Sequence, residues 1–233
     1  MDSTPPRTSH QVVIPASSPH THPVSRRGGS RTTLPSTKLV DVIERACKPG
    51  RVPLVVSLDG RSGVGKSTLA PKVAEETVAA IVPVDEFYAG AITDAEWDRM
   101  TAQERWANVF CWESLRIQVI KPLLAGCPAR WFPIDFDTGP LIDGTYLLKT
   151  SLTEIEPAPV IILDGVYSSG PQLADLLDLA VLIDAPDEER RARLASREDA
   201  EFLAKWHARW DAVEDFYFSQ VRARNSFDLV VTT

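Results

Sequence analysis

A glycine-rich segment at residues 60–67 constrains the fold more than any other part of the chain. It reads Gly-Arg-Ser-Gly-Val-Gly-Lys-Ser, and it lies between an apolar run at 54–58 and a segment of helical character. The spacing Gly-x4-Gly-Lys-Ser lets successive backbone N–H groups turn inward toward an anion that bulky side chains would block. The helix that follows adds the positive end of its dipole. The pattern therefore predicts binding of a nucleoside triphosphate.

Each position of this loop has an expected task. Lys66 supplies a positive charge to the β- and γ-phosphates, and Ser67 offers its hydroxyl to Mg²⁺. Pro71 falls inside the helix that should follow, so we expect a local kink there. The residues expected to contact ATP in this segment are Gly60, Ser62, Gly63, Val64, Gly65, Lys66, Ser67 and Thr68.

Apolar runs of strand length alternate with helical patterns along the rest of the chain. The runs lie at 54–58, 80–84, 160–163, 179–183 and 229–231, and they are apolar at consecutive positions, as in strands buried on both faces. Such alternation is typical of βαβ units in a doubly wound α/β sheet. A helix is also predicted from Ser36, its N-cap, to the Pro49-Gly50 pair. We therefore expect one α/β domain over residues 36–233.

Residues 1–35 differ in composition from this domain. They are rich in Ser, Thr, Pro and Gly, and apart from a Val-Val-Ile triplet they have little to bury. Such a segment does not offset the entropy of ordering, so we expect a mobile N-terminal extension. A targeting segment and a segment that binds a specific partner are the alternatives.

The charge and cysteine content exclude several classes of function. The chain has 32 acidic and 25 basic side chains, a net charge of −7, which argues against nucleic acid or an anionic membrane surface as a partner. The four arginines and one aspartate of residues 1–35 carry +3, so the remaining domain has a net charge of −10. There is no apolar run of about 18 residues. Three cysteines without zinc or redox spacing favour a reduced, cytoplasmic protein.

Two acidic residues follow predicted strands, at the edge where open α/β sheets bind ligands. Asp164 follows the run 160–163, and we expect it to reach Mg²⁺ directly or through water, with a loop cap as the alternative. Asp85 follows the run 80–84, where a carboxylate can accept the proton of an attacking hydroxyl. A solvated or capping acid is its alternative. The neighbouring Glu86 could act in its place, and the sequence does not separate the two.

Arginines recur at spacings of three and four near the C-terminus, at Arg190, Arg193 and Arg197. On a helix these positions share one face. One interpretation is a lid that closes over a triphosphate, because arginine donates paired hydrogen bonds to phosphate. The other is a face of ion pairs with nearby glutamates, which are Glu188, Glu189 and Glu201. Farther on, a near-helical spacing of apolar residues predicts a buried helix face, with a base-stacking surface as the alternative. It is formed by Phe202, Trp206, Trp210, Val213 and Tyr217.

Together these motifs resemble the uridine kinase-like group of P-loop kinases. The resemblance covers about residues 50–232. It rests on the phosphate loop, Asp85-Glu-Phe-Tyr, Phe132-Pro-Ile-Asp-Phe, Leu163-Asp-Gly-Val-Tyr, the arginine helix, and Trp206, Trp210 and Glu214. It implies a P-loop NTPase three-layer fold, with a five-stranded parallel sheet between helices and a mobile helical lid.

The resemblance also implies roles for single residues. By similarity, Asp85 activates the acceptor hydroxyl, Tyr88 lies near the acceptor, and Asp135 belongs to the segment that walls a nucleoside site. Arg193 and Arg197 match the lid arginines, and with Asp85 and Lys66 they form the expected catalytic set. Two features depart from uridine kinases. These usually have Glu-Gly in place of Asp164-Gly165, and a His a few residues after Tyr-Asp-Phe, which this chain lacks.

The function expected from the sequence is transfer of the γ-phosphate of Mg·ATP to a hydroxyl of a small molecule, with a nucleoside as the first candidate. Two other classes stay open. One is an ATPase or nucleotide-dependent switch that acts on a protein partner. The other is a binding module without catalysis, against which the intact Lys66-Ser67 pair argues.

Overall fold

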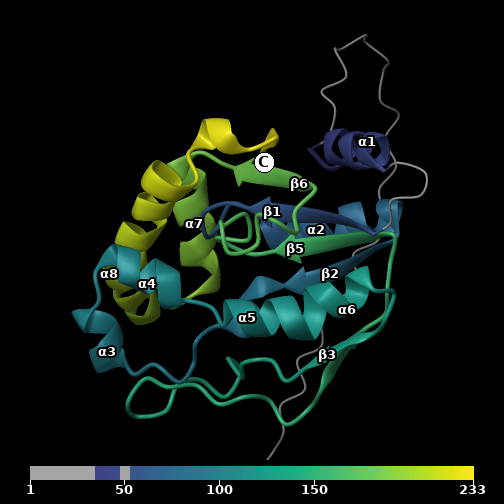
Figure 1. Cartoon of the computed structure of the whole chain (residues 1–233). Helices are drawn as coiled ribbons and strands as arrows, with labels where there is room; N and C mark the ends of the chain where they lie inside the picture. Colours follow the sequence, from purple (N-terminus) through teal and green to yellow (C-terminus); the bar gives the residue numbers. More distant parts are fainter. Residues whose placement is uncertain (1–34, 48–52) are drawn as a thin grey trace, which may run out of the picture. The chain divides into compact units, whose positions relative to one another are not determined.

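A computed structural model describes residues 35–47 and 53–233. The predicted N-terminal extension lies outside these residues, apart from Pro35, where the first helix begins. Five parallel strands form the central sheet in the order β2-β5-β1-β6-β7 (Figure 1). They are β1 (Leu54–Asp59), β2 (Ala79–Pro83), β5 (Val160–Asp164), β6 (Leu179–Asp184) and β7 (Leu229–Thr232). Every predicted apolar run lies in one of these strands to within one residue, so the predicted α/β sheet is confirmed.

The register of the sheet brings three strand ends together. β1 pairs with β5 on one side and with β6 on the other, so its C-terminal end lies in the middle of the sheet edge. Leu58 of β1 and Pro83 of β2 both align with Asp164 at the end of β5. The residues that follow β1, β2 and β5 therefore meet at one edge, as expected for ligand sites in such sheets.

Helices cover both faces of the sheet and give three layers. On one face, α1 (Pro35–Ala46) and α2 (Lys66–Thr77) pack buried side chains such as Ile43 and Val73 against β1 and β5. On the other face lies a continuous helical segment made of α5 (Trp112–Ser114), η2 (Leu115–Ile120) and α6 (Lys121–Leu124), whose middle turn is π-helical. It buries residues such as Leu115 and Leu123 against the sheet. The predicted three-layer arrangement is confirmed.

Smaller elements frame the C-terminal edge of the sheet. η1 (Val84–Phe87) follows β2, and α3 (Asp94–Arg99) and α4 (Ala102–Asn108) each begin with a Thr–Glu capping box. β3 (Ala129–Trp131) and β4 (Thr153–Ile155) form a separate antiparallel pair. α7 (Asp187–Arg197), α8 (Ala200–Phe216), η3 (Tyr217–Val221) and η4 (Arg224–Ser226) lead to β7. In the described part of the chain, no helix is long and apolar enough to cross a bilayer.

Local predictions can be compared with the structure one by one. α2 contains Pro71 and continues past it to Thr77, so the proline does not end the helix, and the kink expected there stays a prediction. α1 starts at Pro35, one residue before the predicted cap. Of the predicted apolar stripe, Val213 and Tyr217 are fully buried. Trp206 and Trp210 are partly buried, and the side chain of Phe202 lies outside what the structure describes.

Candidate active site at the C-terminal edge of the sheet

The glycine-rich loop leaves β1 and turns directly into α2, which begins at Lys66. Two of its glycines are required by close approaches as well as by their dihedral angles. Gly60 has φ +147°, and a Cβ there would lie 2.2 Å from the carbonyl oxygen of Ile183 in β6. Gly63 has φ +83°, and a Cβ there would lie 2.6 Å from the carbonyl oxygen of Arg190 in α7. The loop is therefore packed between β6 and α7, which only glycine permits.

Lys66 is buried and holds its ammonium group over this loop. Its Nζ donates hydrogen bonds to the carbonyl oxygens of Gly60, at 2.7 Å, and Arg61, at 3.1 Å. The positive charge also acts on the neighbouring strand ends, because it lowers the pKa of both Asp85 and Asp164 against the effect of burial. Lys66 thus lies between the loop and the two carboxylates that the sequence selected.

Asp164 ends β5 with its side chain largely buried. Burial raises the pKa of its carboxyl group, while the charge of Lys66 and a hydrogen bond from Ser67 lower it. Its Oδ1 atom is buried and has no hydrogen-bond partner among the described residues. A carboxylate oxygen free to bind, beside a serine hydroxyl, fits a hard cation such as Mg²⁺, which prefers oxygen ligands. The residues present therefore fit the expected metal.

Asp85 lies in η1, directly after β2. Its carboxylate makes no hydrogen bond within the described residues, and the side chain remains accessible to solvent in a crowded part of the edge. Although Asp85 is exposed, crowding by the surrounding protein weakens the hydration of its carboxylate and raises the pKa of Asp85 to about 6, with Lys66 lowering it and Asp164 raising it further. Gly165, the residue after Asp164, lies close by, since a Cβ added there would be 3.5 Å from Oδ1 of Asp85. Asp85 is therefore poised to exchange a proton near neutral pH.

The structure distinguishes the neighbours Asp85 and Glu86. Oε2 of Glu86 accepts a hydrogen bond at 2.8 Å from Nε1 of Trp131 in β3. The backbone carbonyl of Glu86 also accepts the amide of Ile134, at 3.1 Å. Glu86 thus fixes the segment around β3, while the carboxylate of Asp85 faces the electrostatic field of Lys66 and Asp164. Of the two carboxylates, that of Glu86 has a hydrogen-bond partner and that of Asp85 has none among the described residues.

Tyr88 is the centre of a group of aromatic rings, here called the aromatic cluster. Its ring centroid lies between 5.8 and 6.2 Å from those of its neighbours. The cluster consists of Tyr88, Trp97, Phe136, Tyr146 and Trp210. Trp97 is fully buried, whereas Phe136 is exposed. Sequence analysis selected Tyr88 but missed Trp97 and Tyr146 as its partners, because no motif connects these separate segments.

Asp135 lies next to this cluster in sequence but is engaged in its own turn. Its Oδ1 accepts the amide of Thr138 at 3.2 Å, and its Oδ2 accepts the Thr138 hydroxyl. These hydrogen bonds lower the pKa of the Asp135 carboxyl group. Its backbone amide donates to the carbonyl oxygen of Leu147 at 2.8 Å. Asp135 therefore shapes the loop that presents Phe136, and a contact with an acceptor stays a prediction.

The three arginines of α7 that sequence analysis selected have different surroundings. Arg190 is buried, and it binds Asp187 at 2.8 Å and the Ser62 carbonyl oxygen at 3.2 Å. Arg193 is partly exposed and reaches the glycine-rich loop at the carbonyl oxygen of Val64, at 3.3 Å.

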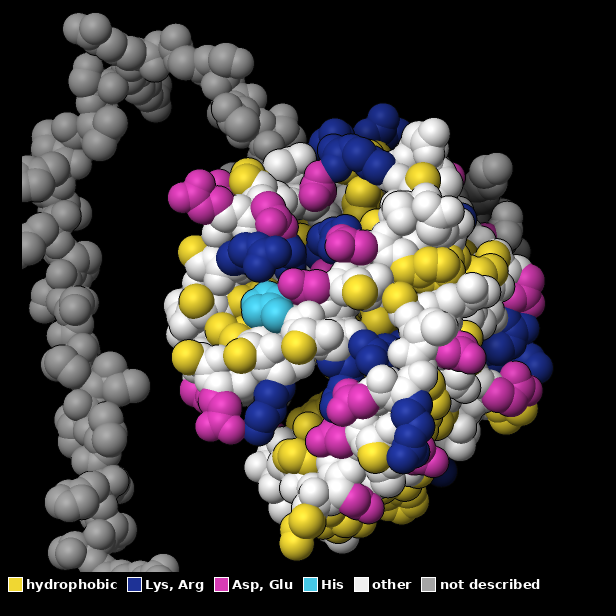
Figure 2. All heavy atoms as spheres, turned by 90° about the vertical axis from the view of Figure 1, so that its left-hand side faces the viewer, with side chains coloured by type: hydrophobic (Ala, Val, Ile, Leu, Met, Phe, Trp, Pro, Cys, Tyr) yellow, Lys and Arg dark blue, Asp and Glu magenta, His cyan; other side chains and the backbone are white. Residues whose placement is uncertain are grey.

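Arg193 and Arg197 also form ion pairs. Arg193 binds Glu189 at 3.0 Å, as the ion-pair interpretation predicted, and Arg197 binds Glu198 at 2.7 Å. Arg197 is exposed, and its charge lowers the pKa of Asp85. The charge of Arg197 thus reaches the strand edge where Asp85 lies, and its contact with a ligand stays a prediction. The face that carries α8 has a hollow with Lys and Arg side chains at its edge (Figure 2).

Sequence analysis missed Asp59, the last residue of β1. Its side chain is fully buried and accepts four hydrogen bonds. The donors are the amides of Gly60 (2.7 Å), Tyr167 (2.8 Å) and Ser169 (3.0 Å) and the hydroxyl of Tyr217 (2.6 Å). A charged residue at the end of an apolar run, directly before Gly60, was the available signal. Asp59 fixes the start of the glycine-rich loop.

Comparison with known proteins supports the fold. No protein-family model and no curated protein matches the chain. Among solved structures, a possible uridine kinase from Bacillus stearothermophilus matches with a TM-score of 0.62 at 18% identity, over 84% of this chain and 97% of that one. A structure described as a candidate fructose transport system kinase from a Silicibacter species matches with a TM-score of 0.58 at 19% identity, over 85% and 98%. The resemblance to P-loop kinases is therefore confirmed at the level of the fold.

Proposed function

We propose that the protein transfers the γ-phosphate of Mg·ATP to a hydroxyl group of a small molecule. The observation that carries the proposal is the position of Asp85. It lies beside the glycine-rich loop and within the electrostatic field of both Lys66 and Asp164, and its pKa is raised to about 6. A phosphate loop alone supports binding or hydrolysis of a nucleotide. The carboxylate of Asp85, in the short helix that Tyr88 of the aromatic cluster follows, adds what an acceptor hydroxyl needs.

The proposed reaction is a direct transfer. The acceptor oxygen attacks the γ-phosphorus, the bond from that phosphorus to the bridging oxygen of ADP breaks, and Asp85 takes the proton from the acceptor hydroxyl. Lys66, Arg193 and Arg197 offset the negative charge on the transferring group. Mg²⁺, held by Ser67 and Asp164, would neutralise phosphate charge and orient the oxygens. Because little covalent work falls to the protein, positioning and charge carry most of the catalysis.

The aromatic cluster favours an acceptor that contains a ring. Tyr88 directly follows η1, the element that carries Asp85, and Phe136 and Tyr146 pack against Tyr88. Aromatic faces bind planar bases by stacking and also accept the C–H face of a sugar. The two structural neighbours are described as a possible uridine kinase and as a candidate kinase of a fructose transport system, which motivates a choice of these two acceptor classes. We therefore propose nucleosides and free sugars as the first acceptors to examine.

The test is a screen of ADP formation by the purified protein with Mg·ATP and a panel of nucleosides, sugars and vitamin-like alcohols. We expect one class to raise ADP formation well above the rate without acceptor, and mass spectrometry should find the phosphorylated product. Lys66→Ala should abolish the reaction, whereas Lys72→Ala, an exposed lysine on the same helix, should not. Fast hydrolysis that no acceptor accelerates would favour an ATPase or switch instead, and undiminished activity of Lys66→Ala would refute the proposal.

A further inference from the structure

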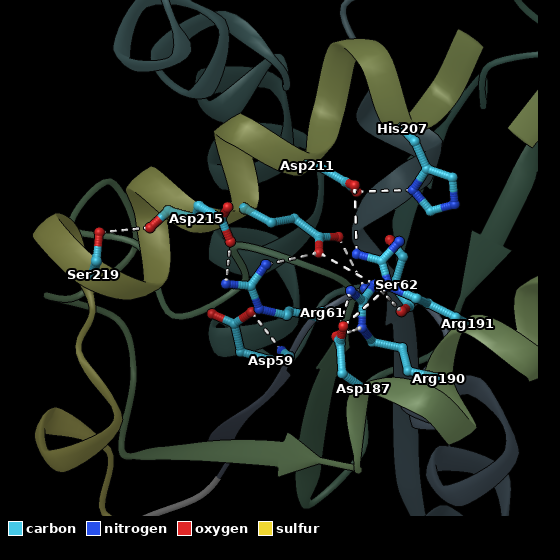
Figure 3. Close-up of polar contacts among 12 residues, drawn as sticks. Asp59, Arg61, Ser62, Asp187, Arg190, Arg191, His207, Asp211, Asp215 and Ser219 are labelled. Atoms are coloured by element: carbon cyan, nitrogen blue, oxygen red, sulfur yellow. Dashed lines mark hydrogen bonds and ion pairs between the residues drawn. The ribbon is translucent and has the colours of Figure 1, made fainter. Parts of the chain in front are cut away.

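Glu214, in the last turn of α8, contacts the glycine-rich loop although 152 residues separate it from Ser62. Its side chain is only 1% exposed. Its Oε1 atom accepts a hydrogen bond from the backbone amide of Ser62 at 2.9 Å. Figure 3 shows Arg61, Ser62 and Arg190 converging below α8. A carboxylate buried this deeply costs free energy unless it is paired, so the contact needs an explanation.

Two arginines balance the charge of Glu214. Its Oε2 lies 3.6 Å from Nη1 of Arg61 and 3.8 Å from Nη1 of Arg190. At these distances Oε2 makes no hydrogen bond among the described residues, so the directional contact of this carboxylate is the one to Ser62. Burial raises the pKa of Glu214, and the Ser62 hydrogen bonds, Lys66 and Arg190 lower it.

Arg190 fixes the other side of the same residue. Its Nη1 donates to the carbonyl oxygen of Ser62 at 3.2 Å, while its Nη2 is held by Asp187 at 2.8 Å. Both backbone polar groups of Ser62 are thus bound by side chains from α7 and α8. The Ser62 amide points to α8 and is not offered to a phosphate, so an ATP contact through this amide is not available. The Val64 amide donates within the loop, to the carbonyl oxygen of Arg61 at 3.4 Å, so an anion is left with other amides of the loop.

We infer that Glu214 is a positioning residue for nucleotide binding. It holds the Ser62 amide toward α8, and the rest of the loop thereby keeps the backbone conformation that binds an anion. The inference rests on the proposed function only in its choice of ligand. A loop fixed before the ligand arrives does not pay the entropy of ordering on binding, and affinity rises accordingly. The same helix, α8, carries Trp210 of the aromatic cluster one turn before Glu214. α8 therefore contacts both the aromatic cluster and the glycine-rich loop.

Three substitutions separate positioning from simple charge balance. Glu214→Gln keeps an oxygen that accepts from Ser62 but removes the charge. Glu214→Asp keeps the charge but withdraws the carboxylate by one methylene, and Glu214→Ala removes both. The matched control is Asp215→Asn, because Asp215 is the next residue and binds Arg61 at 2.6 Å but is exposed.

Two measurements on the full-length protein compare these variants with wild type. Hydrogen exchange at the Ser62 amide, followed by NMR, reports the contact whether or not any nucleotide binds. Calorimetric titration with Mg·AMP-PNP reports the consequence. We expect faster exchange and about tenfold weaker binding in Glu214→Ala and Glu214→Asp, as for loss of one charge-assisted hydrogen bond. Glu214→Gln should remain within about threefold of wild type, and Asp215→Asn should be unchanged.

The opposite ranking, with Glu214→Asp intact and Glu214→Gln impaired, would overturn the inference in favour of charge balance for Arg190. Unchanged exchange or unchanged AMP-PNP affinity in folded Glu214→Ala would overturn it outright. Failure of the proposed function is a separate result. In that case wild-type protein binds AMP-PNP but phosphorylates no acceptor, and the ranking of the variants still decides the role of Glu214.

Discussion

Asp59 and Tyr167 join the two strand ends on which the site is built. Oδ1 of Asp59, at the end of β1, accepts the backbone amide of Tyr167 at 2.8 Å. Tyr167 has φ +67°, a left-handed conformation that is strained for a bulky residue. Its ring packs on that of Tyr217, with centroids 4.9 Å apart, and the hydroxyl of Tyr217 donates to the same carboxylate. This buried network holds the turn that follows Asp164 against the start of the glycine-rich loop.

Replacing Asp59 with Asn should destabilise the protein without changing its shape. One of the two carboxylate oxygens becomes an NH₂ donor that faces other donors, so at least one buried N–H or O–H group loses its partner. We expect a loss of about 2–4 kcal/mol in the free energy of unfolding, measured by urea denaturation. Asp228→Asn is the control. Exposed Asp228 accepts one amide, that of Ala180 at 2.8 Å, which the Asn oxygen can still do, so the loss there should stay below about 1 kcal/mol.

Asp85→Asn should separate binding from transfer. If Asp85 takes the acceptor proton, the variant binds Mg·ATP normally but transfers phosphate about 10²–10⁴-fold more slowly. For wild type, kcat/KM should rise with pH through about 6 and then level off, because only the ionised carboxylate accepts a proton. Glu86→Gln is the comparison variant. A pH profile that stays flat through this range in wild type would remove Asp85 from the role.

The same carboxyl group should lower stability at high pH. Its folded pKa of about 6 lies above the ordinary aspartate value of 3.8, so the folded state resists ionisation, and the stability that this contributes at low pH is lost as pH rises from about 4 to 6. Asp85→Asn removes that penalty. The variant should therefore melt at a higher temperature than wild type at pH 8, with the difference vanishing near pH 4, as calorimetry at both pH values would show.

The fold and part of the site could be predicted from the sequence because their signals are local. Buried parallel strands appear as apolar runs, and a carboxylate directly after such a run, such as Asp85 or Asp164, must lie at the edge where ligands bind. The aromatic partners of Tyr88 and the contact between Ser62 and Glu214 have no local signal. They depend on how distant segments of the chain pack together, and 152 residues separate Ser62 from Glu214. The arginines show the same limit, since spacing groups them but does not reveal that Arg190 is buried.

Arg197→Ala should lower the rate of transfer and leave the fold intact. Arg197 is exposed and its ion pair with Glu198 is a surface pair of small energetic value, but its charge reaches Asp85. We expect kcat to fall about 10²-fold, as for loss of one donor to the transferring group, with the melting temperature within about 1 °C of wild type. Arg191→Ala, from the same helix and also exposed, serves as the control. Equal loss of activity in both variants would refute a specific role for Arg197.

Gly63→Ala should disrupt nucleotide binding through a steric contact with α7. Two costs are combined at this position. The left-handed backbone, φ +83°, disfavours any Cβ by about 1 kcal/mol, and the new methyl group would lie 2.6 Å from the Arg190 carbonyl oxygen and 2.9 Å from Cγ of Leu194. Gly126→Ala isolates the first cost, because Gly126 has φ +73° with no atom within 4 Å of the added Cβ.

We expect urea denaturation to give a loss of about 1 kcal/mol in the free energy of unfolding for Gly126→Ala and about 2–4 kcal/mol for Gly63→Ala, since overpacking adds to the strain. Titration with Mg·AMP-PNP should show weakened binding in Gly63→Ala and wild-type affinity in Gly126→Ala. Equal stability of the two variants would mean that α7 moves away from the loop at no cost.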